Sequence, residues 1–207
     1  MFNKRKTIAG IVFSALIVII ESIGFVDILI RHGSGVFIYY TQLSNMFLLI
    51  VSVVWIIMLI NQLKEKRPAN KAGLMLKYLA TCTVAQTFFI VIFVLTPTTK
   101  MGFSALMFSR DCVVFHTVGP LLAMISFIFF DHGHTITMKD TVIALIPTLA
   151  YAAVAIPLNI LRIWHGPYPF LYVHEQSVLA SYIWAIVVLG CAYLIALVLR
   201  IIKKKLQ

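Results

Sequence analysis

Two side chains that could act together in nucleophilic catalysis lie near the starts of two long apolar segments. Thr41, Ser44 and Asn45 have i, i+3, i+4 spacing, which places them on one helix face. His116 lies about four residues into another apolar segment, as Thr41 does into its own. A threonine hydroxyl becomes a good nucleophile when a base takes its proton, and histidine suits that role near neutral pH. The sequence predicts Thr41 as nucleophile and His116 as base.

Both residues also have ordinary structural roles, which stay open as alternatives. A threonine hydroxyl in a membrane helix often bonds the carbonyl four residues earlier or joins two helices. A single intramembrane histidine often packs with one hydrogen bond. Pro120 lacks the N–H that would bond the carbonyl of His116, so we expect a bend there. The freed carbonyl then either serves the site or is satisfied by neighbouring helices.

Further polar side chains in apolar surroundings could support this pair, because a polar group in hydrocarbon is costly without a role or a partner. For the oxyanion formed when an ester is attacked, the expected donors are Ser44, Asn45 or a backbone N–H freed by a bend. Either Asp111 or Glu21 could orient the ring of His116, and the sequence alone does not show which. The full set of pocket and support candidates is Glu21, Ser44, Asn45, Gln86, Arg110, Asp111, Asn159 and His174.

Two carboxyl groups fall within the first apolar segment. An unpaired carboxylate at the centre of a membrane costs at least ~2.5 kcal/mol. We therefore expect Glu21 or Asp27 to face the bundle interior, either as a neutral acid or paired with Arg110 or Arg162.

The elements that position these residues must be membrane helices. The chain has 207 residues, of which 61% are hydrophobic and 12% charged, whereas soluble domains are about half apolar and a quarter charged. The net charge of +10 comes from short basic runs beside apolar segments. Such runs anchor helices at the lipid surface, so this charge does not indicate a nucleic-acid partner.

Six segments are long enough to span a bilayer, which takes about 20 apolar residues. The first is longer than the core of a signal peptide, so we expect it to be an uncleaved helix. The prediction is an all-α, polytopic integral membrane protein with a single transmembrane domain over residues 1–207. Its spans cover about 8–30, 37–63, 74–95, 112–130, 141–161 and 178–201.

The distribution of basic residues predicts the orientation. With the N-terminus inside, 13 of the 17 lysines and arginines fall in cytoplasmic segments. The opposite orientation would reverse this bias, so both termini are predicted to be cytoplasmic. Nearly all the polar groups then fall in the outer half of the bilayer, and the cytoplasmic half is expected to be poor in them. This separation predicts a polar pocket that opens toward the extracytoplasmic side of a cell membrane.

No cofactor or metal site is predicted. Asp131, His132 and His134 resemble ligands, but no fourth ligand is near them in the sequence, and a solvated turn is the preferred interpretation. The three cysteines form no CxxC pair, so no disulfide framework is expected. The connection 162–177 contains Gly166-Pro167-Tyr168-Pro169, a turn-forming segment. It could form an aromatic belt at the interface or a lid over the pocket.

Two short motifs carry a family resemblance. The segment 39–45, Tyr-Tyr-Thr-Gln-Leu-Ser-Asn, resembles the opening of the second span in a family of bacterial six-span proteins, and 115–120, Phe-His-Thr-Val-Gly-Pro, resembles its fourth span. Both segments are also similar to the corresponding parts of the eukaryotic androgen-induced and androgen-dependent TFPI-regulating proteins. Those are transmembrane hydrolases that cleave fatty acid esters of hydroxy fatty acids. The resemblance implies Thr41 as nucleophile and His116 as base, and the Thr-x-x-Ser-Asn form leaves the substrate open.

Two functions of different classes follow. The first is an intramembrane hydrolase or acyltransferase that acts on a lipid-like acyl ester drawn from membrane lipids. The second is a transporter, channel or sensor, in which Glu21, Asp27, Arg110, Asp111 and Arg162 would bind a ligand or conduct protons. The expected lack of polar groups in the cytoplasmic half and of an internal repeat argues against the second function.

Overall fold

The computed structural model describes residues 3–67 and 70–206, and in these two ranges the chain is helical with no strand. Six helical stretches in them are long and apolar enough to cross a membrane, which makes this an all-α, multi-pass membrane protein. The spans are Lys4–Ile38, Tyr40–Glu65, Lys71–Thr98, Val113–Phe130, Met138–Ile160 and Val178–Leu206.

Several spans are built from more than one helical element. The elements are α1 (Lys4–His32), η1 (Gly33–Ile38), α2 (Tyr40–Glu65), α3 (Lys71–Ile90), η2 (Val91–Leu95), α4 (Thr96–Thr98), α5 (Gly102–Phe108), η3 (Val113–Val118), α6 (Gly119–Ile125), η4 (Ser126–Phe130), α7 (Met138–Ile143), α8 (Ile146–Ile160), η5 (Pro169–Leu171) and α9 (Val178–Leu206).

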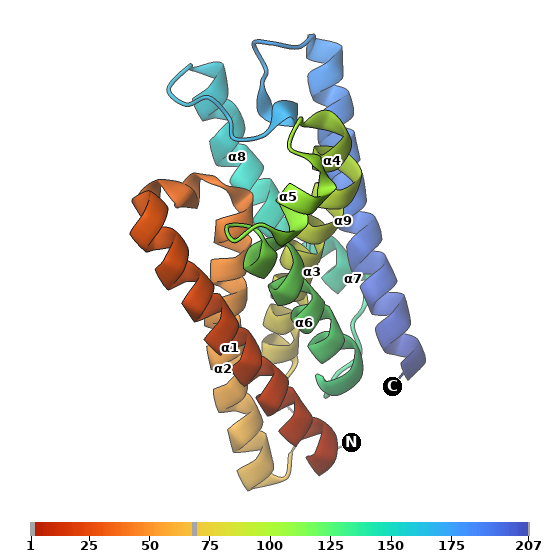
Figure 1. Cartoon of the computed structure of the whole chain (residues 1–207). Helices are drawn as coiled ribbons and strands as arrows, with labels where there is room; N and C mark the ends of the chain where they lie inside the picture. The colour runs from red at the N-terminus through yellow and green to blue at the C-terminus, as the bar shows by residue number, and fades with distance from the viewer. Residues whose placement is uncertain (1–2, 68–69, 207) are drawn as a thin grey trace.

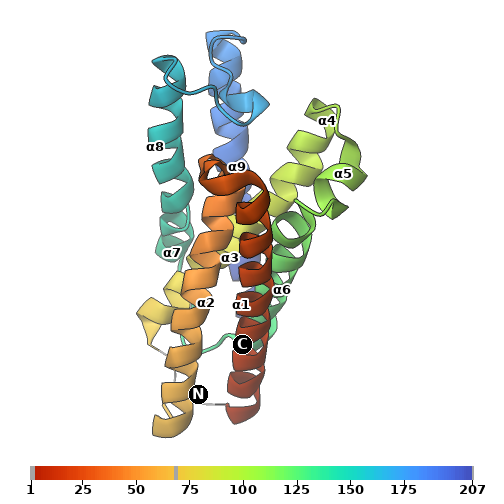
Figure 2. The same ribbon diagram turned by 60° about the vertical axis from the view of Figure 1, so that its left-hand side comes forward.

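Both termini lie at the same end of the bundle, which we call the proximal end (Figure 1). The opposite, distal end carries η1, α4, α5 and the connection 161–177. The central helix is α3, which packs against α2, α6 and α9. Helices α8 and α9 extend past α1 and α2 at the distal end, where the connection 161–177 joins them (Figures 1 and 2).

Capping residues explain where several helices begin. The side chains of Asn3 and Asn70 accept hydrogen bonds from the backbone N–H groups of the first turns of α1 and α3. Thr137 and Asp140 form a reciprocal capping box at the start of α7. These side chains satisfy backbone donors that have no partner inside the helix. The starts of α1, α3 and α7 are therefore determined by capping residues next to them in the sequence.

Three π-helical segments interrupt the regular helices, and one of them, η3, contains His116. Pro120 follows it at the start of α6. A proline removes one backbone donor, and the wider π-turn is a known way to accommodate such a gap in a helix. The helix changes from π to α just before Pro120, and the bend expected there stays a prediction.

The connection 96–111 contains the short helices α4 and α5, and α5 packs beside η3 (Figure 2). Thr117 Oγ1 donates to the carbonyl of Met107 at 2.7 Å and helps to fix this α5–η3 hairpin.

The prediction that the proximal half is poor in polar groups is wrong. Lys77 is fully buried there, and its Nζ lies 3.5 Å from both Ser14 Oγ and Ser52 Oγ. Asp131 is also fully buried and accepts hydrogen bonds from Trp55 Nε1 at 2.7 Å and from Ser126. This could not be predicted from the sequence, because these residues come from different helical elements and are brought together only by packing.

The interpretation of residues 131–134 as a solvated turn is wrong for two of its residues. Asp131 and His132 are buried against the bundle, and Lys203 donates to the carbonyl of Phe127 at 2.6 Å, next to that turn. Basic side chains favour the carbonyl ends of helices. The proximal turn is therefore a packed part of the core.

An apolar layer separates the proximal polar residues from the distal ones. On α1, Ile17 lies between Ser14 and Glu21, and it packs in one buried cluster with residues of α2, α3 and α6. The cluster consists of Ile17, Leu48, Val51, Ala80, Val84 and Ala123. Each of its members is closely packed, so this layer divides the interior into two polar compartments.

Candidate active site at Thr41 and His116

The structure brings Thr41 and His116 together near the distal end. Thr41 Oγ1 lies 3.4 Å from His116 Nε2, within reach of a hydrogen bond that can tighten when substrate binds. Thr41 is buried in the first turn of α2 and His116 is half-buried in η3. The equal depth expected from the two segment starts is confirmed.

The hydrogen bond on the other side of the imidazole fixes its tautomer. His116 Nδ1 lies 2.6 Å from the carbonyl oxygen of Leu106 in α5. A carbonyl can only accept, so Nδ1 carries the hydrogen, and Nε2 of the neutral ring is left as an acceptor facing Thr41. The group that orients His116 is thus a backbone carbonyl, and neither Asp111 nor Glu21 contacts the ring.

A third residue, Tyr168, completes the surroundings of the Thr41 hydroxyl. Its phenol oxygen lies 3.4 Å from Thr41 Oγ1 and accepts a hydrogen bond from the backbone N–H of Thr41 at 3.3 Å. Burial raises the pKa of the Tyr168 phenol to about 12, so it keeps its hydrogen at neutral pH. The phenol is therefore a buried donor directed at the threonine hydroxyl.

Tyr168 was missed as a functional residue by sequence reasoning. The Gly166-Pro167-Tyr168-Pro169 segment indicated a fixed turn, and the lid interpretation of this connection agrees with the burial of Tyr168 beneath it. The available signal was a tyrosine between two prolines, which restricts the backbone on both sides. Its partner, however, lies 127 positions away.

Asn159 and His174 hold this connection in place rather than lining a pocket. Asn159 is buried, donates to the carbonyl of Trp164 at 3.2 Å and accepts from the backbone N–H of Val173 at 3.2 Å. His174 Nε2 lies 3.2 Å from the carbonyl oxygen of Asn159. These bonds close the connection over the end of α8.

Ser44 and Asn45 lie beside Thr41 as predicted, but neither is free to stabilise an oxyanion. Ser44 Oγ donates to the carbonyl of Thr41 at 2.9 Å. Asn45 Nδ2 donates to the carbonyls of Thr41 at 2.8 Å and Phe115 at 3.1 Å. Their donors are used to hold the backbone on both sides of the site, so the oxyanion donor expected from them must come from elsewhere.

Glu21 faces the interior, as predicted, and is fully buried. Both of its carboxyl oxygens lack a hydrogen-bond partner within the described residues. It lies beside Gly119 at the start of α6.

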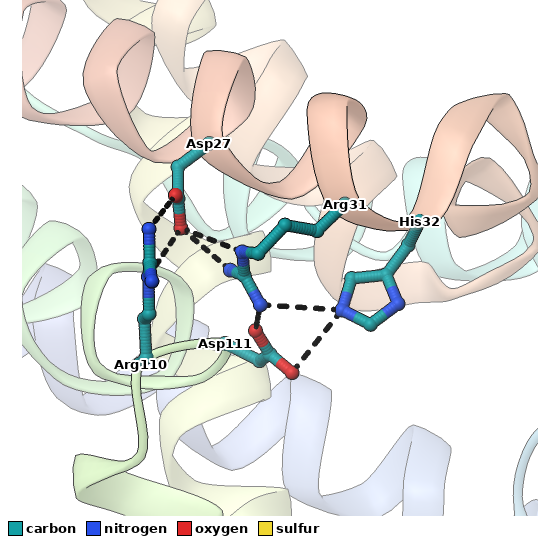
Figure 3. Close-up of polar contacts among 5 residues, drawn as sticks. All are labelled: Asp27, Arg31, His32, Arg110 and Asp111. Carbon is teal, nitrogen blue, oxygen red and sulfur yellow. Dashed lines mark hydrogen bonds and ion pairs between the residues drawn. The ribbon is translucent and has the colours of Figure 1, made fainter.

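Arg110 and Asp111 belong to an ion-pair cluster at the distal surface, so their prediction as pocket residues is wrong. Figure 3 shows Arg110 and Arg31 converging on Asp27, and Arg31 also contacting Asp111. The hydrogen bond from Arg31 lowers the pKa of the Asp111 carboxyl. The cluster joins the end of α1 to the α5–η3 hairpin, and the expected pairing of Asp27 with Arg110 is confirmed.

Two apolar cavities share Tyr40 and Tyr151 in their walls, and Thr41 lines one of them. One, of about 520 Å³, lies between α3, α8 and α9 and is lined by Thr41 and Gln86. The other, of about 550 Å³, lies between α2 and α8 and is lined by Ser44. The rings of Tyr40 and Tyr151, 5.3 Å apart, line both. Each volume is in the range of about 300–1,000 Å³ typical of small-molecule sites.

Gln86 is placed as predicted, in the wall of the first cavity. Its Oε1 accepts hydrogen bonds from Thr148 at 2.6 Å and Tyr40 at 3.2 Å. These bonds link α2, α3 and α8 just below Thr41.

In residues 3–67 and 70–206, no group of three or more histidine, cysteine or acidic side chains could hold a metal ion.

Comparisons of the chain with known protein families, with curated proteins and with solved structures each find no match. The family suggested by residues 39–45 and 115–120 therefore stays a prediction.

Proposed function

We propose that this protein is an intramembrane hydrolase or acyltransferase that acts on lipid acyl esters with Thr41 as nucleophile. The observation that supports it best is the position of the Thr41 hydroxyl, between the acceptor nitrogen of His116 and the phenol of Tyr168 in the wall of an apolar cavity. The two motifs that resemble the androgen-induced protein family include both Thr41 and His116.

The first step forms an acyl-enzyme. Thr41 Oγ1 attacks the ester carbonyl carbon and its proton passes to His116 Nε2. The carbonyl oxygen becomes an oxyanion that accepts a hydrogen bond from the Tyr168 phenol. Thr41 also lies in the first turn of α2, where the helix dipole favours negative charge. When the intermediate collapses, His116 returns the proton to the departing alcohol.

The second step releases the acyl group. A water molecule, or a second alcohol in the case of acyl transfer, gives its proton to His116 Nε2 and attacks the acyl carbon. The same oxyanion forms, and Thr41 leaves as its hydroxyl when it regains the proton. The buried carbonyl of Leu106 supports His116 throughout, because it accepts from Nδ1–H in both charge states of the ring.

The two cavities support a substrate with two apolar arms. An ester bound at Thr41 would place one chain in the cavity that Thr41 lines, and its other chain would pass Tyr40 and Tyr151 to reach the cavity lined by Ser44. Fatty acid esters of hydroxy fatty acids have this shape. We further propose that both termini are cytoplasmic and that the site opens toward the extracytoplasmic leaflet of a cell membrane, in agreement with the distribution of basic residues.

A transporter, channel or sensor remains the second candidate, and one observation favours it more than the sequence did. Lys77 and Asp131 provide buried charged groups in the proximal half, which a conducting route would need. The packed layer around Ile17 and Leu48 interrupts that route. The hydrolase is therefore the better supported function.

A lipid-like fluorophosphonate probe separates the two candidates. The purified protein should be labelled, and Thr41→Ala should lose the label, because the hydroxyl that reacts is gone. Thr98→Val is the matched control, since Thr98 bonds only within its own helical stretch and should label normally. Equal labelling of Thr41→Ala and the unmodified protein would exclude the proposed nucleophile.

A further inference from the structure

Three buried oxygen atoms lie together beside the site with no donor to satisfy them. They are Oε1 and Oε2 of Glu21 and Oδ1 of Asn45, none of which has a hydrogen-bond partner among the described residues. Both side chains are 0% exposed. Buried polar atoms are almost always paired, so these acceptors call for a donor, which a hydrogen on the Glu21 carboxyl would supply.

The orientation of the Asn45 amide is fixed by its other contacts. Its Nδ2 lies 2.8 Å from the carbonyl oxygen of Thr41 and 3.1 Å from that of Phe115. Because carbonyls only accept, the NH₂ group must face them. Asn45 thus ties the nucleophile in α2 to the residue next to His116 in η3, and its oxygen points away from both.

The Glu21 carboxyl and the Asn45 oxygen both lie close to Gly119. A β-carbon added there would overlap Glu21 Oε1 and lie 3.2 Å from Asn45 Oδ1 and 3.1 Å from the carbonyl oxygen of Val114. The two side chains therefore converge on one point against the backbone of Gly119, and only a glycine leaves room for the carboxyl there.

Within residues 3–67 and 70–206, no basic side chain bonds to this carboxyl. Arg31 and Arg110 form ion pairs with Asp27 at the distal surface. Lys77 bonds to Ser14 and Ser52 on the far side of the apolar layer that contains Ile17.

A metal ion does not fit either. Hard cations take six to eight oxygen ligands, whereas the oxygens that meet at Gly119 come only from Glu21, Asn45 and the Val114 carbonyl. A hydrogen on the carboxyl would instead give the Asn45 oxygen the donor it lacks.

We propose that Glu21 donates its carboxyl hydrogen to Asn45 Oδ1 and is a positioning residue for the Thr41–His116 pair. This inference rests on the proposed hydrolase function for its catalytic consequence, but the hydrogen bond itself does not. The bond from Glu21 satisfies the amide oxygen while the NH₂ group faces the two carbonyls. Without it the buried oxygen has no donor, and the link between α2 and η3 that sets the distance from Thr41 to His116 is weakened.

Infrared difference spectroscopy of the purified protein tests the hydrogen bond without any assay of activity. The unmodified protein should show a carboxylic-acid C=O band at neutral pH that is absent in Glu21→Gln. The band should move to the higher frequency of a free acid in Asn45→Ala. Asp111→Asn is the control and should leave the band unchanged, because Asp111 is an ion-paired carboxylate. Absence of the acid band, or a band that ignores Asn45→Ala, would overturn the proposal.

Fluorophosphonate labelling rates test the positioning role. Glu21→Gln keeps an N–H donor for Asn45 and should label within about twofold of the unmodified protein. Glu21→Met removes the donor at similar size and should label about 10- to 100-fold more slowly, as expected when reacting groups are misplaced. Equal rates for the two variants, with matched thermal unfolding, would refute the role. If no protein labels but the infrared result holds, the hydrolase function has failed and the Glu21–Asn45 bond stands.

Discussion

At the scale of single residues, the site depends on groups whose hydrogen-bond roles are fixed by what surrounds them. His116 is an acceptor toward Thr41 because Leu106 occupies its other nitrogen. Tyr168 accepts from the Thr41 backbone N–H, which leaves its own O–H free to donate. The residue types were visible in the sequence, but these roles were not, because each is set by a partner on another element.

The phenol of Tyr168 gives the sharpest prediction at this scale. Tyr168→Phe keeps the ring and removes the donor, so hydrolysis or labelling should fall about 10²–10³-fold, as for other oxyanion donors. Tyr172→Phe on the same connection is the control and should change the rate little, since Tyr172 packs on His165. A Tyr168→Phe protein with full activity and unchanged stability would remove Tyr168 from the mechanism.

At the scale of elements, the α5–η3 hairpin is what presents His116, and the ion-pair cluster at Asp27, Arg31, Arg110 and Asp111 fastens that hairpin to α1 (Figure 3). The six spans were predictable because a run of about 20 apolar residues can be recognised in the sequence as a membrane helix. The predicted span 112–130 agrees with the observed Val113–Phe130. The hairpin was not predictable, because α4 and α5 are short and are held by contacts with η3.

The ion-pair cluster predicts an acid-sensitive attachment of the hairpin. The pKa of Asp111 is lowered by its hydrogen bond to Arg31, so the carboxylate stabilises the fold above its unfolded-state pKa of about 3.9. That contribution is lost as the pH falls through the lower, folded-state value. It should be small and weakened by salt, because the pair is solvent-exposed.

Thermal unfolding in detergent between pH 2 and pH 7 measures this effect. Asp111→Asn should unfold at a lower temperature at pH 7 in low salt, and the difference should shrink at acidic pH. Glu175→Gln, which removes the exposed pair with His165, is the control for a general loss of surface charge. A difference that does not shrink at low pH would show that Asp111 acts by packing rather than by charge.

At the scale of the whole molecule, two polar compartments lie on either side of one packed apolar layer. The distal compartment was predictable from the depth of polar residues in each span. The proximal compartment was not, because Lys77 and Asp131 looked like anchors and turn residues at the ends of apolar runs. Only packing shows that they are buried, and such burial depends on which helices are neighbours.

The orientation of the bundle gives the prediction at this scale. In a background without the three native cysteines, Lys100→Cys and Arg162→Cys should react with an impermeant maleimide added to intact cells. Lys64→Cys and Lys204→Cys should react only after the membrane is opened, because the basic residues at the proximal end favour the cytoplasm. Labelling of Lys64→Cys in intact cells would reverse the topology.

The central claim, that Thr41 is an acylated nucleophile, is tested most directly by mass spectrometry of the probe-treated or substrate-quenched protein. The account predicts an adduct on a peptide that contains residues 39–45, with fragment ions that place it on Thr41 and not on Ser44. The adduct should be absent in His116→Ala, because no base activates the hydroxyl. An adduct on another residue, or hydrolysis that persists in Thr41→Ala, would contradict the account.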